Sequence, residues 1–454
     1  MPNPTSQETR APKQLLVLAS LSLVTLGMAA QLFIKVHRYA VNILFSDQWD
    51  TYNPLFYDYG IWQSFTQQHG PMRLGAGMLL SEAVAIATGW NTRVEAFVVG
   101  FILLLIGAMA IYLKWRLFNK LTIWDSLIPL ICLSAAQLEA VTIVTFPAYS
   151  AVPVLLLILY AICLTCQNVN LLYGALSLLN FLLVFSAWGI FVGLLTPFLL
   201  CYLVFRHITV CDVRAKRWAG LALAASLLSL GLFFVNYKFM PAVECFHFSH
   251  HPLRDYLWFV AHMVSSSAAV PCAFYGHFLS RGFGTLLMLV FVVVLASKIW
   301  KLYREKEYES KDVVIAIFIS FSLFFAMTTA IGRVCLGECA AGAPRYRLLL
   351  VPAWLALYLT VAPMGRSLHR AGGGLLILTL CFLLPQLRSP FYEKNMGYYN
   401  EVKSKWKACY LEKEDAETCD KEVGMSIYHP IRSATAQDKL DHLKQKHLNF
   451  FGDR

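Results

Sequence analysis

The sequence predicts an all-α polytopic membrane protein with about eleven transmembrane helices and a small polar C-terminal tail. Of its 454 residues, 58% are hydrophobic and only 14% are charged, whereas soluble domains average about 25% charged residues. The mean hydropathy is +0.56, and long apolar runs recur, each ended by Arg, Lys or turn residues. The formal charge of +11 is expected in loops that set topology, so it does not indicate nucleic-acid binding.

The first apolar run, 14–34, follows a short, polar and weakly basic N-terminus. A cleaved signal peptide is the competing interpretation, but its apolar region spans only about 7–15 residues. We therefore predict that 14–34 is the first transmembrane helix and that the N-terminus is cytoplasmic.

The next apolar segment, 73–90, is interrupted by Glu82 and three glycines. The run that follows it, 95–113, ends in the basic cluster of Lys114, Arg116 and Lys120. If 73–90 also crossed the membrane, that cluster would lie outside, against the positive-inside rule. We therefore expect 73–90 to lie at the outer interface and 95–113 to be the second crossing.

The remaining apolar runs alternate so that every dense basic cluster falls on one side of an inner (plasma) membrane. The further crossings are predicted at 124–141, 150–166, 171–186, 189–205, 218–236, 284–300, 312–331, 348–363 and 371–386. This gives a transmembrane domain, 1–386, with a first outer loop, 35–94, and an extracytoplasmic tail, 387–454. No internal repeat is apparent, so an inverted-repeat transporter gains no support.

Six of the twelve cysteines are predicted to lie outside, where an oxidising compartment permits disulfides. They are Cys245, Cys272, Cys335, Cys339, Cys409 and Cys419. Sequence alone cannot choose among their pairings, and the local pairs Cys335–Cys339 and Cys409–Cys419 are the expected ones. A zinc site is not expected, because no CxxC occurs beside a matching pair of histidines.

Two acidic residues in the first outer loop, Asp47 and Asp50, are spaced i, i+3 within FSDQWDTYNP. Two such carboxylates can hold a divalent cation, Mg²⁺ or Mn²⁺, or one can act as a general base. They either share a helical turn or straddle a loop, and the simpler alternative is that they mark the hydrated end of a helix. His69 and Arg73 follow; His69 is a candidate acid, base or substrate contact, or a structural residue.

Outer loops generally carry few basic residues, yet the short segment 332–347 carries three arginines. These arginines are Arg333, Arg345 and Arg347, with Tyr346 between the last two. A guanidinium group matches the oxygens of a phosphate, so the cluster predicts phosphate binding, with anchoring to lipid headgroups as the alternative. Gln137 and Glu139 end an apolar run on the same side, where a carboxylate is costly unless it faces a cavity or the surface.

The layout resembles the GT-C superfamily of membrane glycosyltransferases, which carry an acidic motif in the first outer loop. More closely, it resembles bacterial inner-membrane proteins of glycosyltransferase type, over roughly residues 14–386. The matching positions are Ser46–Asp50, His69 to Arg73, Gln137 with Glu139, and Gly332, Arg333, Gly337, Arg345 and Tyr346.

This resemblance implies a polyprenyl-phosphate sugar donor that enters from the membrane lipids and a glycan or glycolipid acceptor on the outer, periplasmic face. It implies that Asp47 or Asp50 is the general base or a metal ligand. It also implies that Arg333, Arg345 or Arg347 holds the donor phosphate. Two departures are that His69 and Arg73 are not adjacent and that the tail is short.

The sequence also allows other functions. A lipid-linked sugar translocase would place charges along a path through the membrane, whereas the predicted spans are nearly free of charge. A membrane acyltransferase would need a histidine at a membrane-embedded tunnel, and no such spacing stands out. A non-catalytic assembly subunit of a polysaccharide pathway could use the charged C-terminal helix, 439–451, to dock a partner.

Overall fold

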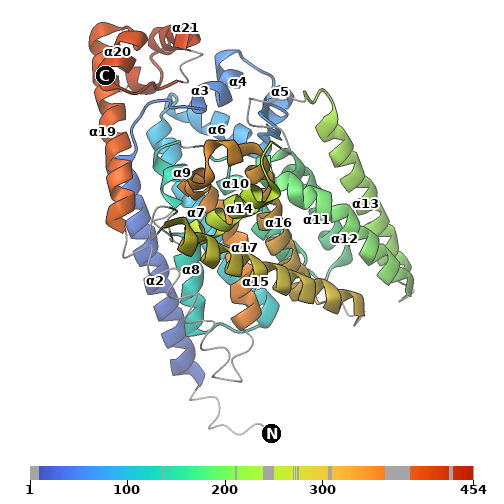
Figure 1. Cartoon of the computed structure of the whole chain (residues 1–454). Coiled ribbons are helices and arrows are strands. Elements are labelled where there is room, and N and C mark those ends of the chain that lie inside the picture. Colours follow the sequence, from blue (N-terminus) through green and yellow to red (C-terminus); the bar gives the residue numbers. More distant parts are fainter. Residues whose placement is uncertain are drawn as a thin grey trace.

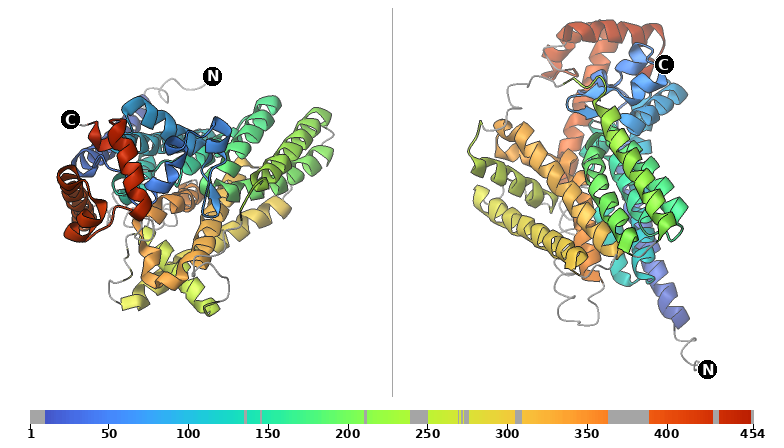
Figure 2. Two further views of the ribbon diagram at one scale, coloured as in Figure 1. Left: turned by 90° about the horizontal axis from the view of Figure 1, so that it is seen from above. Right: turned by 90° about the vertical axis from the view of Figure 1, so that its right-hand side faces the viewer.

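The computed structural model consists almost entirely of helices, and the residues that it describes include one two-stranded hairpin (Figure 1). The start of the first described helix, α2, and the C-terminal helices lie at opposite ends of the molecule (Figure 1 and Figure 2). The structure describes residues 10–134, 137–144, 146–209, 212–238, 250–268, 270, 272, 276–304, 309–362, 389–428 and 433–452.

Six helical segments of this described part are long and apolar enough to cross a membrane, as in a multi-pass membrane protein. They are formed by α2 (Arg10–Tyr39), α7 (Thr92–Phe118), η3 (Ala187–Gly189) with α12 (Ile190–Thr209), α13 (Val213–Phe234), α15 (Gly276–Arg304) and α16 (Ser310–Arg333). The predicted number of eleven is not confirmed. The predicted crossing 371–386 lies outside the described residues.

Other helices are shorter than the roughly 20 residues that a crossing needs. They are α6 (Gly75–Thr88), α8 (Leu127–Cys132), α10 (Ala151–Cys163), α11 (Val169–Phe185), α14 (Leu253–Ser267) and α17 (Arg347–Val361). Most residues of α14, which lies between the predicted crossings 218–236 and 284–300, are buried.

The predicted crossing 124–141 is not one continuous helix. It is divided into η1 (Ile123–Ser126), α8 and the single turn α9 (Glu139–Thr142). Asp125 fixes η1, because its carboxylate receives hydrogen bonds from Lys114 of α7, at 2.7 Å, and from Tyr358 of α17, at 2.5 Å. The break lets Glu139 sit at the start of a separate turn instead of inside an apolar helix, where its carboxylate would be costly to bury.

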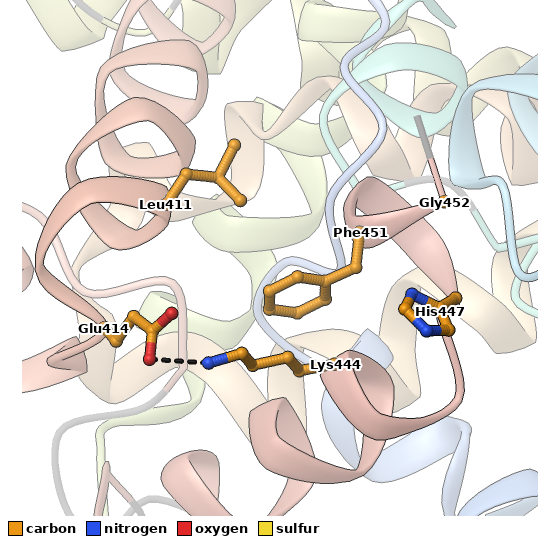
Figure 3. A pocket seen from close by; sticks show the side chains of 6 residues that line it. All are labelled: Leu411, Glu414, Lys444, His447, Phe451 and Gly452. Atoms are coloured by element: carbon orange, nitrogen blue, oxygen red, sulfur yellow. Dashed lines mark hydrogen bonds and ion pairs between the residues drawn. The ribbon is translucent and has the colours of Figure 1, made fainter. Parts of the chain in front are cut away.

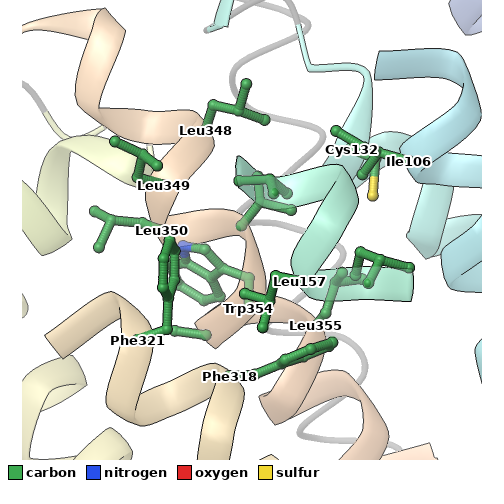
Figure 4. Close-up of a cluster of buried hydrophobic side chains, with 14 of the residues drawn as sticks. Ile106, Cys132, Leu157, Phe318, Phe321, Leu348, Leu349, Leu350, Trp354 and Leu355 are labelled. Carbon is green, nitrogen blue, oxygen red and sulfur yellow. The ribbon is translucent and has the colours of Figure 1, made fainter. Parts of the chain in front are cut away.

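The helix α17 forms the centre of the main hydrophobic core (Figure 4). It is apolar on all sides, as expected of a helix surrounded by others, and Trp354 on it is 2% exposed. Around it lie Phe318 and Phe321 of α16 and Leu157 of α10. The Trp354 indole donates a 2.9 Å hydrogen bond to Ser267 of α14, so its polar atom is satisfied within the core.

The C-terminal segment folds onto the first loop and builds a second core with it. Its elements are α19 (Ser389–Lys413), α20 (Ala416–Val423), α21 (Ser433–Gln445) and η9 (Asn449–Phe451). The loop residue Trp49 is fully buried against Tyr428, with ring centroids 5.9 Å apart, and its carbonyl accepts a 2.5 Å hydrogen bond from Lys439. The charged segment 439–451, which was a candidate for docking a partner, thus packs on its own chain.

One of the two expected cysteine pairs is present in the structure and the other is not. The Cys409–Cys419 disulfide is present and joins α19 to α20. The predicted pair Cys335–Cys339 is wrong, because Cys339 is bonded to Cys272, 67 residues away. Tertiary packing of η5 (Glu338–Gly342) on α14 brings those two distant cysteines together.

The first loop contains three short helices and the hairpin. These are α3 (Gln48–Thr51), α4 (Asn53–Phe56), α5 (Ile61–Phe65), β1 (Gln68–His69) and β2 (Met72–Arg73). Gly70 takes a positive φ of 56° in the hairpin turn, which glycine adopts without a steric penalty. Outside this loop, two further 3-10 turns lie between α16 and α17. They are η4 (Val334–Leu336) and η6 (Pro344–Tyr346).

Candidate functional site

The two acidic residues of the first loop lie on one short helical turn. Asp47 is the residue before α3, and its carbonyl accepts hydrogen bonds from the backbone of Asp50, at 3.1 Å, and of Thr51, at 3.0 Å. Asp47 is exposed and its side chain makes no capping hydrogen bond, whereas Asp50 is half-buried. Of the two arrangements that the sequence left open, the structure therefore has the shared turn.

The hydroxyl of Tyr149 is buried close to these two carboxylates. In the part of the chain that the structure describes, this oxygen has no hydrogen-bond partner. Burial raises the pKa of Tyr149 well above its usual value, the charges of Asp47 and Asp50 raise it further, and Arg345 lowers it. A buried polar atom without a partner is uncommon in folded proteins, so a ligand or water molecule is the expected partner of this hydroxyl.

Glycine in α6 explains how Tyr149 is held in place. A Cβ atom added at Gly77 would lie 2.3 Å from the Cα of Ala148, so α6 approaches the backbone just before Tyr149 as closely as only glycine permits. The ring of Phe146 lies edge-on to Tyr149 at 5.0 Å, and the ring of His69 lies at 5.8 Å. The hairpin that carries His69 thus brings this predicted site residue to the same place.

Glu139 and Arg345 form the charged pair on the other side of this site. Their closest oxygen and nitrogen atoms lie 3.9 Å apart, and the Arg345 side chain is 53% exposed. Burial raises the pKa of Glu139, although Arg345 and Arg347 oppose that effect. Burial lowers the pKa of Arg345, but Tyr346, Glu139 and Asp47 outweigh it, so the pKa of Arg345 is raised. Arg345 therefore stays charged at any ordinary pH.

We refer to Tyr149, Asp47, Asp50, Glu139 and Arg345 as the Tyr149 cluster. Its members come from three segments: the turn before and within α3, the region from α9 to Tyr149, and η6. Charges of both signs act on one buried hydroxyl, an arrangement that suits a polar ligand carrying both a hydroxyl and a phosphate.

Residues of the C-terminal segment complete the surroundings of the cluster, and the sequence did not predict them. Tyr428 donates a 2.7 Å hydrogen bond to Asp50, and Tyr399 lies 5.9 Å from the ring of Phe45. Burial raises the pKa of Tyr399, Glu139 raises it further, and Arg345 lowers it, so this tyrosine also lies close to the charged pair. No local spacing could have revealed these residues, because they follow the loop by more than three hundred positions.

Lys403 is a buried cation of α19 next to the cluster. Its ammonium group donates hydrogen bonds to the carbonyls of Thr142, at 3.5 Å, and Ile143, and lies 4.7 Å from the centre of the Phe45 ring. Burial lowers the pKa of Lys403 to about 7. This lysine joins the C-terminal segment to the end of α9.

Arg73, a predicted substrate-binding residue, has a structural role instead. It is 4% exposed, and its guanidinium donates to the carbonyls of Phe233, at 2.8 Å, of Val235, at 2.6 Å, and of Thr66. These bonds tie the hairpin to the end of α13. The N–H groups of the Arg73 guanidinium are thereby directed at backbone carbonyls. We therefore leave Arg73 out of the proposed site.

Of four other predicted substrate-binding residues, three are buried and one is exposed. Gln137 is buried and donates a 2.9 Å hydrogen bond to the carbonyl of Ile131, while Arg347 and Tyr346 are buried where α17 begins. Arg333 is exposed at the C-terminal end of α16. We assign Arg347 a supporting electrostatic effect on Glu139 and keep Arg345 as the candidate for ligand contact.

Asp47 and Asp50 were also candidate ligands for a divalent cation. Among the described residues, three His, Cys, Asp or Glu ligand atoms come close enough to share an ion only at His262, Cys272 and His277. A cation at the Asp pair would therefore depend on oxygen atoms from water or from a substrate phosphate, which is how Mg²⁺ is commonly bound.

A cavity of about 540 Å³ lies within the C-terminal segment, apart from the Tyr149 cluster (Figure 3). Its lining includes Phe451 and Leu411, and Lys444 is paired with Glu414 across it at 2.6 Å. Because these two charges neutralise each other, we assign no ligand to this cavity.

No protein-family model matches the chain, and no curated protein matches its sequence.

Proposed function

We propose that this membrane protein is a glycosyltransferase that moves a sugar from a polyprenyl-phosphate donor to an acceptor hydroxyl at the Tyr149 cluster. The observation that carries this proposal is the buried hydroxyl of Tyr149, which lacks a partner among the described residues and is near enough to Asp47, Asp50 and Arg345 for their charges to act on it. Such a hydroxyl can hold the acceptor or the sugar between a base and a phosphate-binding cation.

Asp47 is the better candidate for the general base. It is exposed and makes no capping hydrogen bond, so its carboxylate is accessible to an incoming hydroxyl. The carboxylate of Asp50 accepts a hydrogen bond from Tyr428, which holds the turn in shape. We therefore assign Asp50 a positioning role.

Arg345 is the candidate for binding the donor phosphate. Its side chain is half exposed and remains charged, and a guanidinium can donate two parallel hydrogen bonds to one phosphate. The neighbouring carboxylate of Glu139 keeps its guanidinium close to the cluster. A phosphate group would then compete with Glu139 for Arg345.

The proposed reaction proceeds by inversion. The carboxylate of Asp47 takes the proton of the acceptor hydroxyl while that oxygen bonds to the anomeric carbon of the sugar. The bond between the anomeric carbon and the phosphate oxygen breaks, and its electron pair leaves with the lipid phosphate. Arg345 stabilises the negative charge that builds on this leaving group, an effect that is largest where water is excluded.

The test uses the full-length protein, purified and reconstituted with a polyprenyl-phosphate sugar and a glycolipid acceptor. Loss of a general base usually lowers the rate by about 10²–10⁴-fold, so we expect Asp47→Asn to lose transfer by a factor in that range. Asp58→Asn is the matched control, because Asp58 is an exposed loop acid with a left-handed backbone that asparagine also adopts. Full activity of Asp47→Asn would overturn the proposal.

A non-catalytic assembly subunit or lipid-linked sugar translocase is the second candidate. The observation that favours it is the packing of the C-terminal segment over the loop, where Lys439 and Tyr428 contact Trp49 and Asp50. Under this alternative the wild-type protein binds the polyprenyl-phosphate sugar, and Arg345→Ala weakens that binding, but no acceptor is ever glycosylated.

A further inference from the structure

A second group of polar side chains lies where α14, α15 and η5 meet, apart from the Tyr149 cluster. It comprises His262, Cys272, His277, Glu338 and Cys339, which we refer to as the His–Cys cluster. His262 belongs to α14 and His277 to α15, while η5 contributes Glu338 and Cys339. The side chain of His262 is fully buried and that of His277 is 54% exposed, so the cluster opens to its surroundings on one side.

Three ligand atoms of this cluster, from His262, Cys272 and His277, lie close enough together to hold a metal ion. The Sγ atom of Cys272 lies 3.9 Å from Nε2 of His262 and 3.4 Å from Nδ1 of His277. Atoms that bind one zinc ion at 2.0–2.3 Å lie about 3.3–3.7 Å from one another. The two distances from the sulfur are thus within a few tenths of an ångström of this range, and all three atoms lie within 4.8 Å of one another.

The second nitrogen of His262 is already oriented for this role. Its Nδ1 atom lies 2.8 Å from the hydroxyl of Ser280. Its Nε2 atom lies 3.1 Å from a carboxylate oxygen of Glu338 and 3.9 Å from the sulfur of Cys272, so a metal ion at Nε2 would take the place of Glu338. Zinc-binding histidines almost always engage their second nitrogen in such a hydrogen bond, which fixes the ring.

In the state that the structure describes, the sulfur of Cys272 is bonded to that of Cys339. A disulfide sulfur carries no negative charge and is a poor zinc ligand, whereas a thiolate is a strong one. Reduction of this one bond would release two thiolates beside two histidines. Two cysteines and two histidines form one of the common structural zinc sets.

We propose that the reduced protein binds one Zn²⁺ through His262, His277, Cys272 and Cys339, and that forming the Cys272–Cys339 disulfide releases the ion. The two thiolates neutralise the charge of the ion. Glu338 then stays with Arg281, whose guanidinium already donates to both of its oxygens at 2.7 Å. No sequence pattern pointed to this site, because its ligands have none of the usual short spacings.

The redox step requires a dithiol reductant. One thiolate of the dithiol attacks the sulfur of Cys339, which is exposed, and the sulfur of Cys272 leaves as a thiolate. The second thiol of the dithiol then displaces Cys339, and the reductant becomes a disulfide. Two electrons pass to the protein, and each cysteine thiol gives up its proton when it binds zinc.

The test compares zinc binding by the full-length protein before and after reduction with a phosphine, which does not compete for the metal as a thiol would. We expect reduced protein to bind one more equivalent of Zn²⁺ than oxidised protein, and re-oxidation to release it. Co²⁺ in place of Zn²⁺ should give the sulfur-to-metal absorption of a tetrahedral thiolate site.

Substitutions of the proposed ligands show where the Zn²⁺ ion binds. His277→Asn should lower the zinc affinity at least tenfold, and it should fold normally because His277 is half exposed. His250→Asn with His251→Asn is the control for adventitious binding by surface histidines, and Cys409→Ser with Cys419→Ser is the control for the other described disulfide. Equal zinc binding by oxidised and reduced protein, or full binding by both His277→Asn and Cys272→Ser, would overturn the proposal.

Discussion

The hydroxyl of Tyr428 donates a 2.7 Å hydrogen bond to the carboxylate of Asp50, although 378 positions separate the two residues. Next to this contact, the backbone of Ser46 donates a 2.7 Å hydrogen bond to the carbonyl of Ile427. The turn that carries the acidic pair is therefore shaped by the C-terminal segment and not by the loop alone.

This contact predicts that Asp50 and Tyr428 act as a unit. Hydrogen bonds to a charged group contribute about 1.5–3 kcal/mol, so Tyr428→Phe should lower the thermal stability and reduce sugar transfer by displacing the turn. If Asp50 only positions the turn, Asp50→Asn and Tyr428→Phe should affect activity non-additively in a double-mutant cycle. Strictly additive losses would show that Asp50 has a chemical role of its own.

A substitution at Tyr149 should affect stability and substrate binding differently. Removing its buried hydroxyl as Tyr149→Phe should leave the protein as stable or stabilise it by up to about 1–3 kcal/mol, the cost of an unpaired buried polar group. The same change should weaken binding of the lipid-linked substrate. Tyr202→Phe is a matched control, because Tyr202 of α12 has a second buried hydroxyl without a partner among the described residues. Equal activity of the two variants would remove Tyr149 from the site.

Arg345 should respond to substitution as a phosphate-binding residue. Loss of a charge-assisted interaction of about 1.5–3 kcal/mol corresponds to weaker binding of the polyprenyl-phosphate sugar by Arg345→Ala of about 10–150-fold. Arg345→Lys should recover only part of that affinity, because an ammonium group cannot donate two parallel hydrogen bonds. The affinity of each purified variant for the lipid, measured directly in detergent, tests both expectations. Arg254→Ala is the control, since the side chain of Arg254 is 70% exposed on α14.

From the lowered pKa of Lys403 we predict that the free energy of unfolding rises with pH. Its pKa is about 7 in the folded protein against 10.5 for a free lysine, so between these values the unfolded chain binds more protons than the folded one. The free energy of unfolding should therefore increase between pH 7 and pH 10, by at most about 1.4 kcal/mol per pH unit from this group.

Thermal unfolding over that pH range checks the Lys403 prediction. Lys403→Met should flatten the increase, because methionine does not titrate. Lys405→Met on the same helix is the control, since the side chain of Lys405 is 64% exposed and pairs with the exposed Glu401 in a surface i, i+4 contact. An unchanged slope in Lys403→Met would show that Lys403 is not the group responsible.

Arg73 should be important for stability and not for substrate binding. Arg73→Met removes hydrogen bonds to the carbonyls of Phe233, Val235 and Thr66. We expect a loss of at least about 2 kcal/mol, seen as a lower melting temperature, with the affinity for the lipid-linked sugar unchanged in protein that remains folded. Lys238→Met, at an exposed neighbouring position, should change neither quantity. Loss of affinity without loss of stability would return Arg73 to the site.

The sequence by itself determined the helical membrane character and the position of most long helices. The predicted runs 95–113 and 312–331 lie inside α7 and α16, because an apolar stretch bounded by basic residues is a local signal. It also identified the acids of the first loop, Glu139 and Arg345 as unusual residues. It failed at 124–141, where the overall apolar character hid the interruption between Cys132 and Glu139.

Only the tertiary structure decided which of these residues meet. Tyr149 gathers Asp47, Asp50 and Arg345, the C-terminal segment supplies Tyr428, and η5 brings Cys339 to Cys272. Hydrophobic patterns report whether a residue faces lipid, core or water within one element. They hold no information on the contacts between elements hundreds of residues apart, because those depend on how side chains of many helices pack together.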